Sequence, residues 1–63
     1  MEKFTYDGPV AEGDRLIQQR WQGETWANSP AKARVNLAYQ FKKATKRPAM
    51  AKIKLPGEVV RAN

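Results

Sequence analysis

The N-terminal part of the chain alternates apolar and polar residues with the period of a β-strand. Residues 2–6 place Phe4 and Tyr6 on one face and polar side chains on the other, which predicts a short strand. Residues 7–9 (Asp-Gly-Pro) are a strong turn signal, because glycine permits a positive φ and proline fixes its own φ. Residues 12–14 (Glu-Gly-Asp) are a second, weaker break. We therefore expect the first strand to end at Tyr6.

Residues 15–28 fit two different structures. In the first, the whole stretch is one strand with alternating faces. In the second, residues 15–19 form a short helical turn and a strand begins at Arg20. The β-branched and aromatic content of residues 21–27 predicts a strand there, and we favour a strand for residues 15–19 as well.

The two tryptophans test how regular this strand is. Trp21 and Trp26 lie five positions apart, so a regular strand turns them to opposite faces and exposes one of them. Trp21 shares its face with Ile17 and is therefore expected in the core. A bulge at Gly23 is the alternative, because it would shift the phase by one residue and bring both indoles to the same side.

A helix follows, with start and stop signals at both ends. Ser29 is a good N-cap and Pro30 falls at the first helical position, where its missing N–H costs nothing. Pro48 should end the helix near Lys46 or Arg47. One apolar stripe runs along the helix at i, i+4, i+8 and i+11, and its residues are Ala33, Leu37, Phe41 and Ala44.

The last segment returns to strand periodicity. Residues 51–55 alternate, with Ala51, Ile53 and Leu55 inward and lysines outward. Pro56-Gly57 predicts a turn or bulge, residues 59–60 can extend the edge, and residues 61–63 are expected to fray. The prediction is a single α+β domain over residues 1–63. It has the order β-β-α-β, with a three-stranded antiparallel sheet and one helix packed on one face.

Composition limits how this domain can be stabilised and where it works. A chain of 63 residues without cysteine or histidine has no disulfide and lacks the usual zinc ligands, so its core must be plain apolar packing. No apolar run approaches the roughly 20 residues of a membrane span, and the N-terminus lacks a signal-peptide pattern. We expect a cytoplasmic protein that does not enter the membrane.

The sequence contains no motif typical of catalysis or of cofactor binding. There is no histidine or cysteine, no carboxylate pair placed across a pocket, and no glycine-rich loop leading from a strand into a helix. Ser29 is explained by helix capping. We therefore expect no enzyme, no cofactor and no metal.

Charge is distributed very unevenly. The net charge is +6, yet no acid lies between Glu24 and Glu58. Such a cationic surface suits nucleic acid, an anionic membrane or an acidic protein partner. A membrane is disfavoured because the apolar helix stripe is narrow and needed for the core. The plain alternative is a solvated surface, although that usually mixes both signs. The stretch holds Lys32, Arg34, Lys42, Lys43, Lys46, Arg47, Lys52 and Lys54.

Several tracts resemble a known group of proteins. They are Trp21-Gln-Gly-Glu-Thr25, Tyr39-Gln-Phe-Lys-Lys43, Lys52-Ile-Lys-Leu-Pro-Gly57 and the N-terminal Lys3-Phe-Thr-Tyr-Asp-Gly-Pro-Val10. The chain resembles small, largely uncharacterised proteins encoded by phages and integrative elements of Gram-positive bacteria. The resemblance implies a mobile-element context and no catalysis. At the level of fold alone, a three-stranded sheet with one helix is similar to the arm-site-binding domains of tyrosine integrases, which place the sheet in the major groove.

The leading hypothesis is a small basic nucleic-acid-binding accessory protein, with DNA favoured over RNA. The alternative is a protein-interaction module, such as a phage-encoded modulator or inhibitor of a host protein. A homodimer that pairs exposed edge strands, for example through residues 52–55, is a third hypothesis. The residues expected to contact nucleic acid or a partner are Trp26, Lys32, Arg34, Tyr39, Lys42, Lys43, Lys46, Arg47, Lys52 and Lys54.

Overall fold

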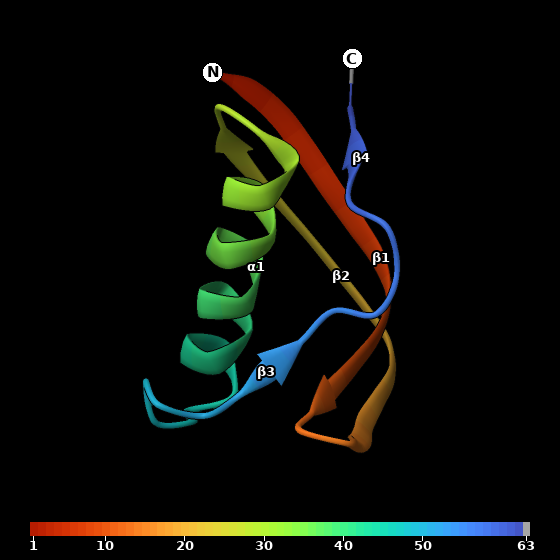
Figure 1. Cartoon of the computed structure of the whole chain (residues 1–63), viewed down its shortest axis with the longest axis vertical. Coiled ribbons are helices and arrows are strands. Elements are labelled where there is room, and N and C mark those ends of the chain that lie inside the picture. The colour runs from red at the N-terminus through yellow and green to blue at the C-terminus, as the bar shows by residue number, and fades with distance from the viewer. Residues whose placement is uncertain (63) are drawn as a thin grey trace.

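The computed structural model describes residues 1–62 and is built around one long antiparallel hairpin (Figure 1). Strand β1 lies centrally, with β2 on one side and with both β3 and β4 on the other. The helix packs against one face of this sheet. The predicted α+β class and element order are confirmed, with the strand after the helix split in two. The elements are β1 (Glu2–Glu12), β2 (Arg15–Ala27), α1 (Pro30–Ala44), β3 (Ile53–Lys54) and β4 (Val60–Arg61).

The turn predicted at residues 7–9 is wrong, because β1 continues through them to Glu12. The pairing of β1 with β2 shifts on both sides of Val10, so the missing N–H of Pro9 falls at an irregular place in the ladder. The hydroxyl of Tyr6 donates to the carbonyl of Pro9 at 2.6 Å and holds the strand there. The chain reverses at the weaker signal instead, where Gly13 has a φ of +60°.

Strand β2 confirms the single-strand interpretation of residues 15–27, and the alternative helical turn does not form. Its register with β1 is regular around Gly23, so no bulge brings the two indoles together. Trp21 faces the helix and packs edge-to-face on Phe41, with ring centroids 5.4 Å apart. Trp26 points to the other face and is 59% exposed. The core assignment of Trp21 is therefore confirmed.

Helix α1 begins as predicted and ends earlier. The Ser29 hydroxyl oxygen accepts a first-turn amide at 3.2 Å, and Pro30 is the first helical residue. The helix ends at Ala44, because Lys46 takes a left-handed conformation with φ of 58°. The amides of Lys46 and Arg47 donate back to the last turn at 3.3 and 2.8 Å, in the pattern of a Schellman cap.

The core fills the space between the sheet and α1. The predicted helix stripe is buried as far as Phe41, whereas Ala44 is exposed at the helix end. The Tyr6 hydroxyl is buried with both of its roles filled, since it also accepts the amide of Gly57 at 2.9 Å. The buried apolar residues are Phe4, Tyr6, Val10, Ala27, Ala33, Leu37, Phe41 and Leu55.

The segment after α1 keeps the predicted alternation but forms little strand. Leu55 is buried and its neighbouring lysines are exposed, yet β3 spans only two residues before Pro56 leads the chain away. The expected fraying from Arg61 is wrong for the described residues, because Arg61 lies in β4 and forms an ion pair with Glu2. The amide of Ala62 also donates to the sheet. Residue 63 lies outside the described residues.

Candidate functional site

Most of the acidic residues are neutralised by a neighbouring cation. Four ion pairs form within residues 1–62, and each uses an acid on β1 or β2. The best defined joins Asp7 to Arg20 through two hydrogen bonds of 2.7 and 2.8 Å, with Gln22 donating a third at 3.1 Å. The Arg20 guanidinium above all, and then the Gln22 amide, lowers the pKa of Asp7 to about 2. The other pairs are Glu2–Arg61, Glu12–Arg47 and Glu24–Lys3.

Two arginines from the predicted site bond other groups of the same chain. Arg34 donates to the main-chain carbonyls of Leu55 and Gly57, the second at 3.0 Å. Arg47 pairs with Glu12 at 2.7 Å, and its guanidinium also lies 6.0 Å from the centre of a core phenylalanine ring. Both arginines therefore hold the segment after α1 against the rest of the molecule. Sequence spacing placed them in the basic stretch but did not reveal these internal partners.

Five lysines remain at the surface without such partners. The side chain of Lys42 is half-buried and donates to the carbonyl of Ala49 at 3.0 Å. The other lysines of the acid-free stretch are exposed, and none forms an ion pair with another residue among 1–62. We call this set the lysine surface; it consists of Lys32, Lys43, Lys46, Lys52 and Lys54.

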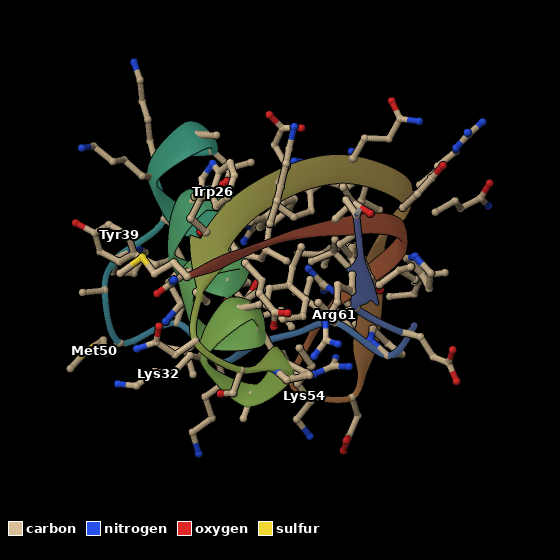
Figure 2. The ribbon with its side chains drawn as sticks, turned by 90° about the horizontal axis from the view of Figure 1, so that it is seen from above. Trp26, Lys32, Tyr39, Met50, Lys54 and Arg61 are labelled. Carbon is tan, nitrogen blue, oxygen red and sulfur yellow. The ribbon has the colours of Figure 1, made fainter. Side chains whose placement is uncertain are left out.

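The lysine surface gathers around α1 and the segment that follows it. Lys46 follows the C-cap residue Thr45 at the end of the helix, and Lys52 and Lys54 flank the inward-facing Ile53 a few residues later. Figure 1 shows the segment that carries these three lysines at the end of the molecule where α1 stops and β3 begins. In the view along the helix, Lys32 and Lys54 both project away from the body of the protein (Figure 2).

Exposed apolar side chains lie on the same helix and beside it. Val35 and Tyr39 on α1 are 66% and 58% exposed, so neither side chain contributes to the core. Trp26 is exposed at the end of β2, next to the helix. Two polar helix residues, Asn36 and Gln40, bond the outer edge of β2 there. Their i, i+4 spacing on the flank of the apolar stripe is the one sequence signal that would have found them.

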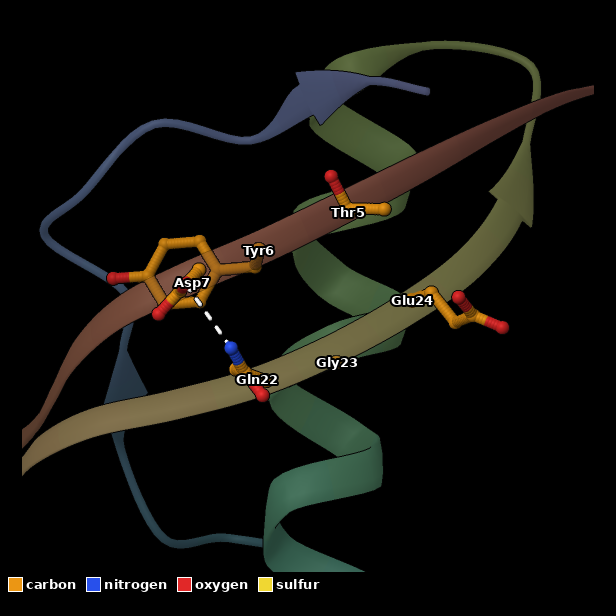
Figure 3. Close-up of a pocket in the computed structure, with 6 residues that line it drawn as sticks. All are labelled: Thr5, Tyr6, Asp7, Gln22, Gly23 and Glu24. Atoms are coloured by element: carbon orange, nitrogen blue, oxygen red, sulfur yellow. Dashed lines mark hydrogen bonds between the residues drawn. The ribbon is translucent and has the colours of Figure 1, made fainter. Parts of the chain in front are cut away.

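A shallow hollow lies on the open face of the sheet, with the helix behind it (Figure 3). Its volume is about 470 Å³, and both of its carboxylates belong to the ion pairs Asp7–Arg20 and Glu24–Lys3. Its charges are thus balanced locally, in contrast to the lysine surface. The lining residues are Thr5, Tyr6, Asp7, Gln22, Gly23 and Glu24.

The described part of the chain offers little support for a metal site, a membrane-spanning helix or a strand-paired dimer. Within residues 1–62 no three potential metal-ligating side chains come together. None of the described helices has the length and apolar character needed to cross a bilayer. The edge suggested for a homodimer offers only the two residues of β3 to a partner strand. Comparisons with models of protein families, with curated proteins and with solved structures returned no match.

Proposed function

We propose that this protein is a small nucleic-acid-binding accessory protein that contacts phosphates through the lysine surface. The observation that carries the proposal is the separation of its charges. Four acids are neutralised at the sheet, while five exposed lysines around α1 and β3 form no ion pair within the described residues. Clustered cations of this kind release counterions from a phosphate backbone, which drives binding.

The helix side suits this role better than the open face of the sheet. A domain that placed its sheet in the major groove would present the Asp7–Arg20 and Glu24–Lys3 pairs to DNA. Those pairs carry as much negative as positive charge, so they would gain little from phosphates. DNA is the proposed nucleic acid because the resemblance described above points to a mobile-element context.

The test is a binding titration at several salt concentrations with labelled duplex, single-stranded DNA and RNA. The variant replaces Lys43, Lys46 and Lys54 together by glutamine, and Arg15→Gln removes an exposed cation at the hairpin end as a control. Wild-type affinity should fall steeply with salt, with a slope of about −0.7 to −0.9 per contacted phosphate. The triple variant should flatten that slope by about two units, and the control should leave it nearly unchanged. Absence of binding to all three nucleic acids at about 50 mM salt would reject the proposal.

A protein-interaction module is the second candidate, and Val35 is the observation that favours it. This side chain is 66% exposed at the centre of α1, and an apolar group there adds nothing to phosphate binding. Lysines on either side would suit an acidic partner. Co-purification that survives nuclease and high salt, and that Val35→Ser abolishes, would favour this candidate over nucleic acid.

A further inference from the structure

Two exposed aromatic side chains lie where β2 passes beside the helix. Trp26 and Tyr39 are 59% and 58% exposed. The side-chain amide of Asn36 donates to the carbonyl of Trp26 at 3.4 Å, and Gln40 donates to that of Glu24 at 3.0 Å. Tyr39 stands one helical turn from Asn36, on the exposed side of α1 that borders this seam between the two elements. Figure 2 shows both aromatic side chains on this side of the molecule.

The fold does not need either ring at this position. The aromatic part of the core is already supplied by other rings: Trp21 packs beside Tyr6 and Phe41 between the sheet and α1, and Phe4 lies in a second buried cluster. Trp26 points away from that core and Tyr39 lies off the buried helix stripe. Tryptophan and tyrosine are enriched at contact surfaces, where the ring is covered and its polar atom can still form a hydrogen bond.

Lysines stand at both ends of this aromatic pair along α1. Lys32, Tyr39 and Lys43 follow one another at spacings of seven and four residues, which places them on one side of the helix. The two lysines are therefore about 16 Å apart along the helix axis, with the phenol ring between them. Neither forms an ion pair with another residue among 1–62.

The combination of flat rings and flanking cations selects one kind of nucleic acid. In a duplex the base faces are covered by their stacked neighbours, so Trp26 and Tyr39 would find only groove edges and sugars. In a single strand the base faces are free to stack on aromatic rings, and the phosphates remain available to lysines. We propose that the seam between β2 and α1 binds single-stranded nucleic acid, with bases on Trp26 and Tyr39 and phosphates beside Lys32 and Lys43. This inference rests on the proposed function.

The experiment compares oligothymidylate, oligouridylate and a mixed-sequence DNA duplex, each about 15 nucleotides long, by fluorescence anisotropy at one salt concentration. Both single strands should bind more tightly than the duplex. Trp26→Ala and Tyr39→Ala should each weaken single-strand binding roughly ten-fold, while Trp26→Phe and Tyr39→Phe keep most of it. Val35→Ala is the matched control, because it removes an equally exposed apolar group from the same helix without removing a ring. Circular dichroism should show that every variant is folded.

The outcomes separate this inference from the proposal on which it rests. Tighter duplex binding, or alanine variants that bind single strands as the wild type does, would overturn the stacking surface and leave phosphate binding intact. A loss with Val35→Ala as large as with Tyr39→Ala would also overturn it, since the ring would then have no special role. Absence of binding to all three probes at low salt would remove both proposals together.

Discussion

The two faces of β2 carry one tryptophan each, and the two indoles have opposite environments. Trp21 faces α1, lies edge-on to Phe41 and covers Gly23 in its own strand. Trp26, five residues later, faces away from the core and is 59% exposed. Between them the register with β1 is regular, so alternation alone separates the two roles. The inner face packs against the helix, whereas the outer face leaves its indole in solvent.

Replacement of each tryptophan by alanine should give the largest difference between the two faces. Trp21→Ala removes the indole that packs on Phe41, and we expect it to lower the free energy of unfolding by about 3 kcal/mol. Trp26→Ala should change it by less than about 0.5 kcal/mol. Urea denaturation followed by circular dichroism measures both values. Equal losses of unfolding free energy in the two variants would show that the two faces of β2 contribute equally to stability, contrary to this comparison.

Gly23→Ala should produce the next largest effect. A Cβ atom added there would lie 2.6 Å from the indole of Trp21, so the ring or the strand must shift. We expect a loss of about 1–3 kcal/mol in the free energy of unfolding, as for other overpacked cores. Gln19→Ala, at an exposed position of the same strand, is the control. In a Trp21→Ala background the cost of Gly23→Ala should largely vanish, and a cost that persisted there would assign it to the backbone instead.

The Asp7–Arg20 ion pair on the open face should make the smallest contribution to the free energy of unfolding. This contribution should be lost at acid pH. Hydrogen bonds from Arg20 and Gln22 lower the pKa of Asp7 from 3.8 to about 2 in the folded protein. The unfolded chain therefore binds this proton at a higher pH than the folded one. The resulting stability is present above pH 3.8 and is lost as the pH falls through about 2.

The measurement is the urea midpoint of the wild type and of Asp7→Asn between pH 7 and pH 2. The two proteins should differ at neutral pH and converge toward the acid end of the series, because the wild-type carboxylate is protonated there. Gln18→Ala, which removes an exposed amide from the same face, should not change the pH dependence. A wild-type advantage that stayed constant down to pH 2 would contradict the role of this ion pair.

Local sequence signals predicted the elements wherever the residues themselves set the backbone. The Ser29 cap and Pro30 begin the helix as expected, because their effect depends only on neighbouring amides. The signal at residues 7–9 failed, because Pro9 could be placed at an irregular point of the ladder and bonded by Tyr6. The end of α1 also shifted, since Lys46 adopted a left-handed conformation that residue type alone does not predict.

By itself, the sequence determined the α+β order of elements, the buried helix stripe up to Phe41 and the concentration of cations after Glu24. Each depends on periodicity or composition along the chain, because the periods of the helix and the strand decide which residues share one face of an element. Only the tertiary structure decided which cations are available. Arg34 and Arg47 bond groups that are 21 and 35 residues away in the chain, whereas the lysine surface finds no such partner within residues 1–62. Contacts at that separation depend on how the elements pack, and a linear pattern of charges does not contain that information.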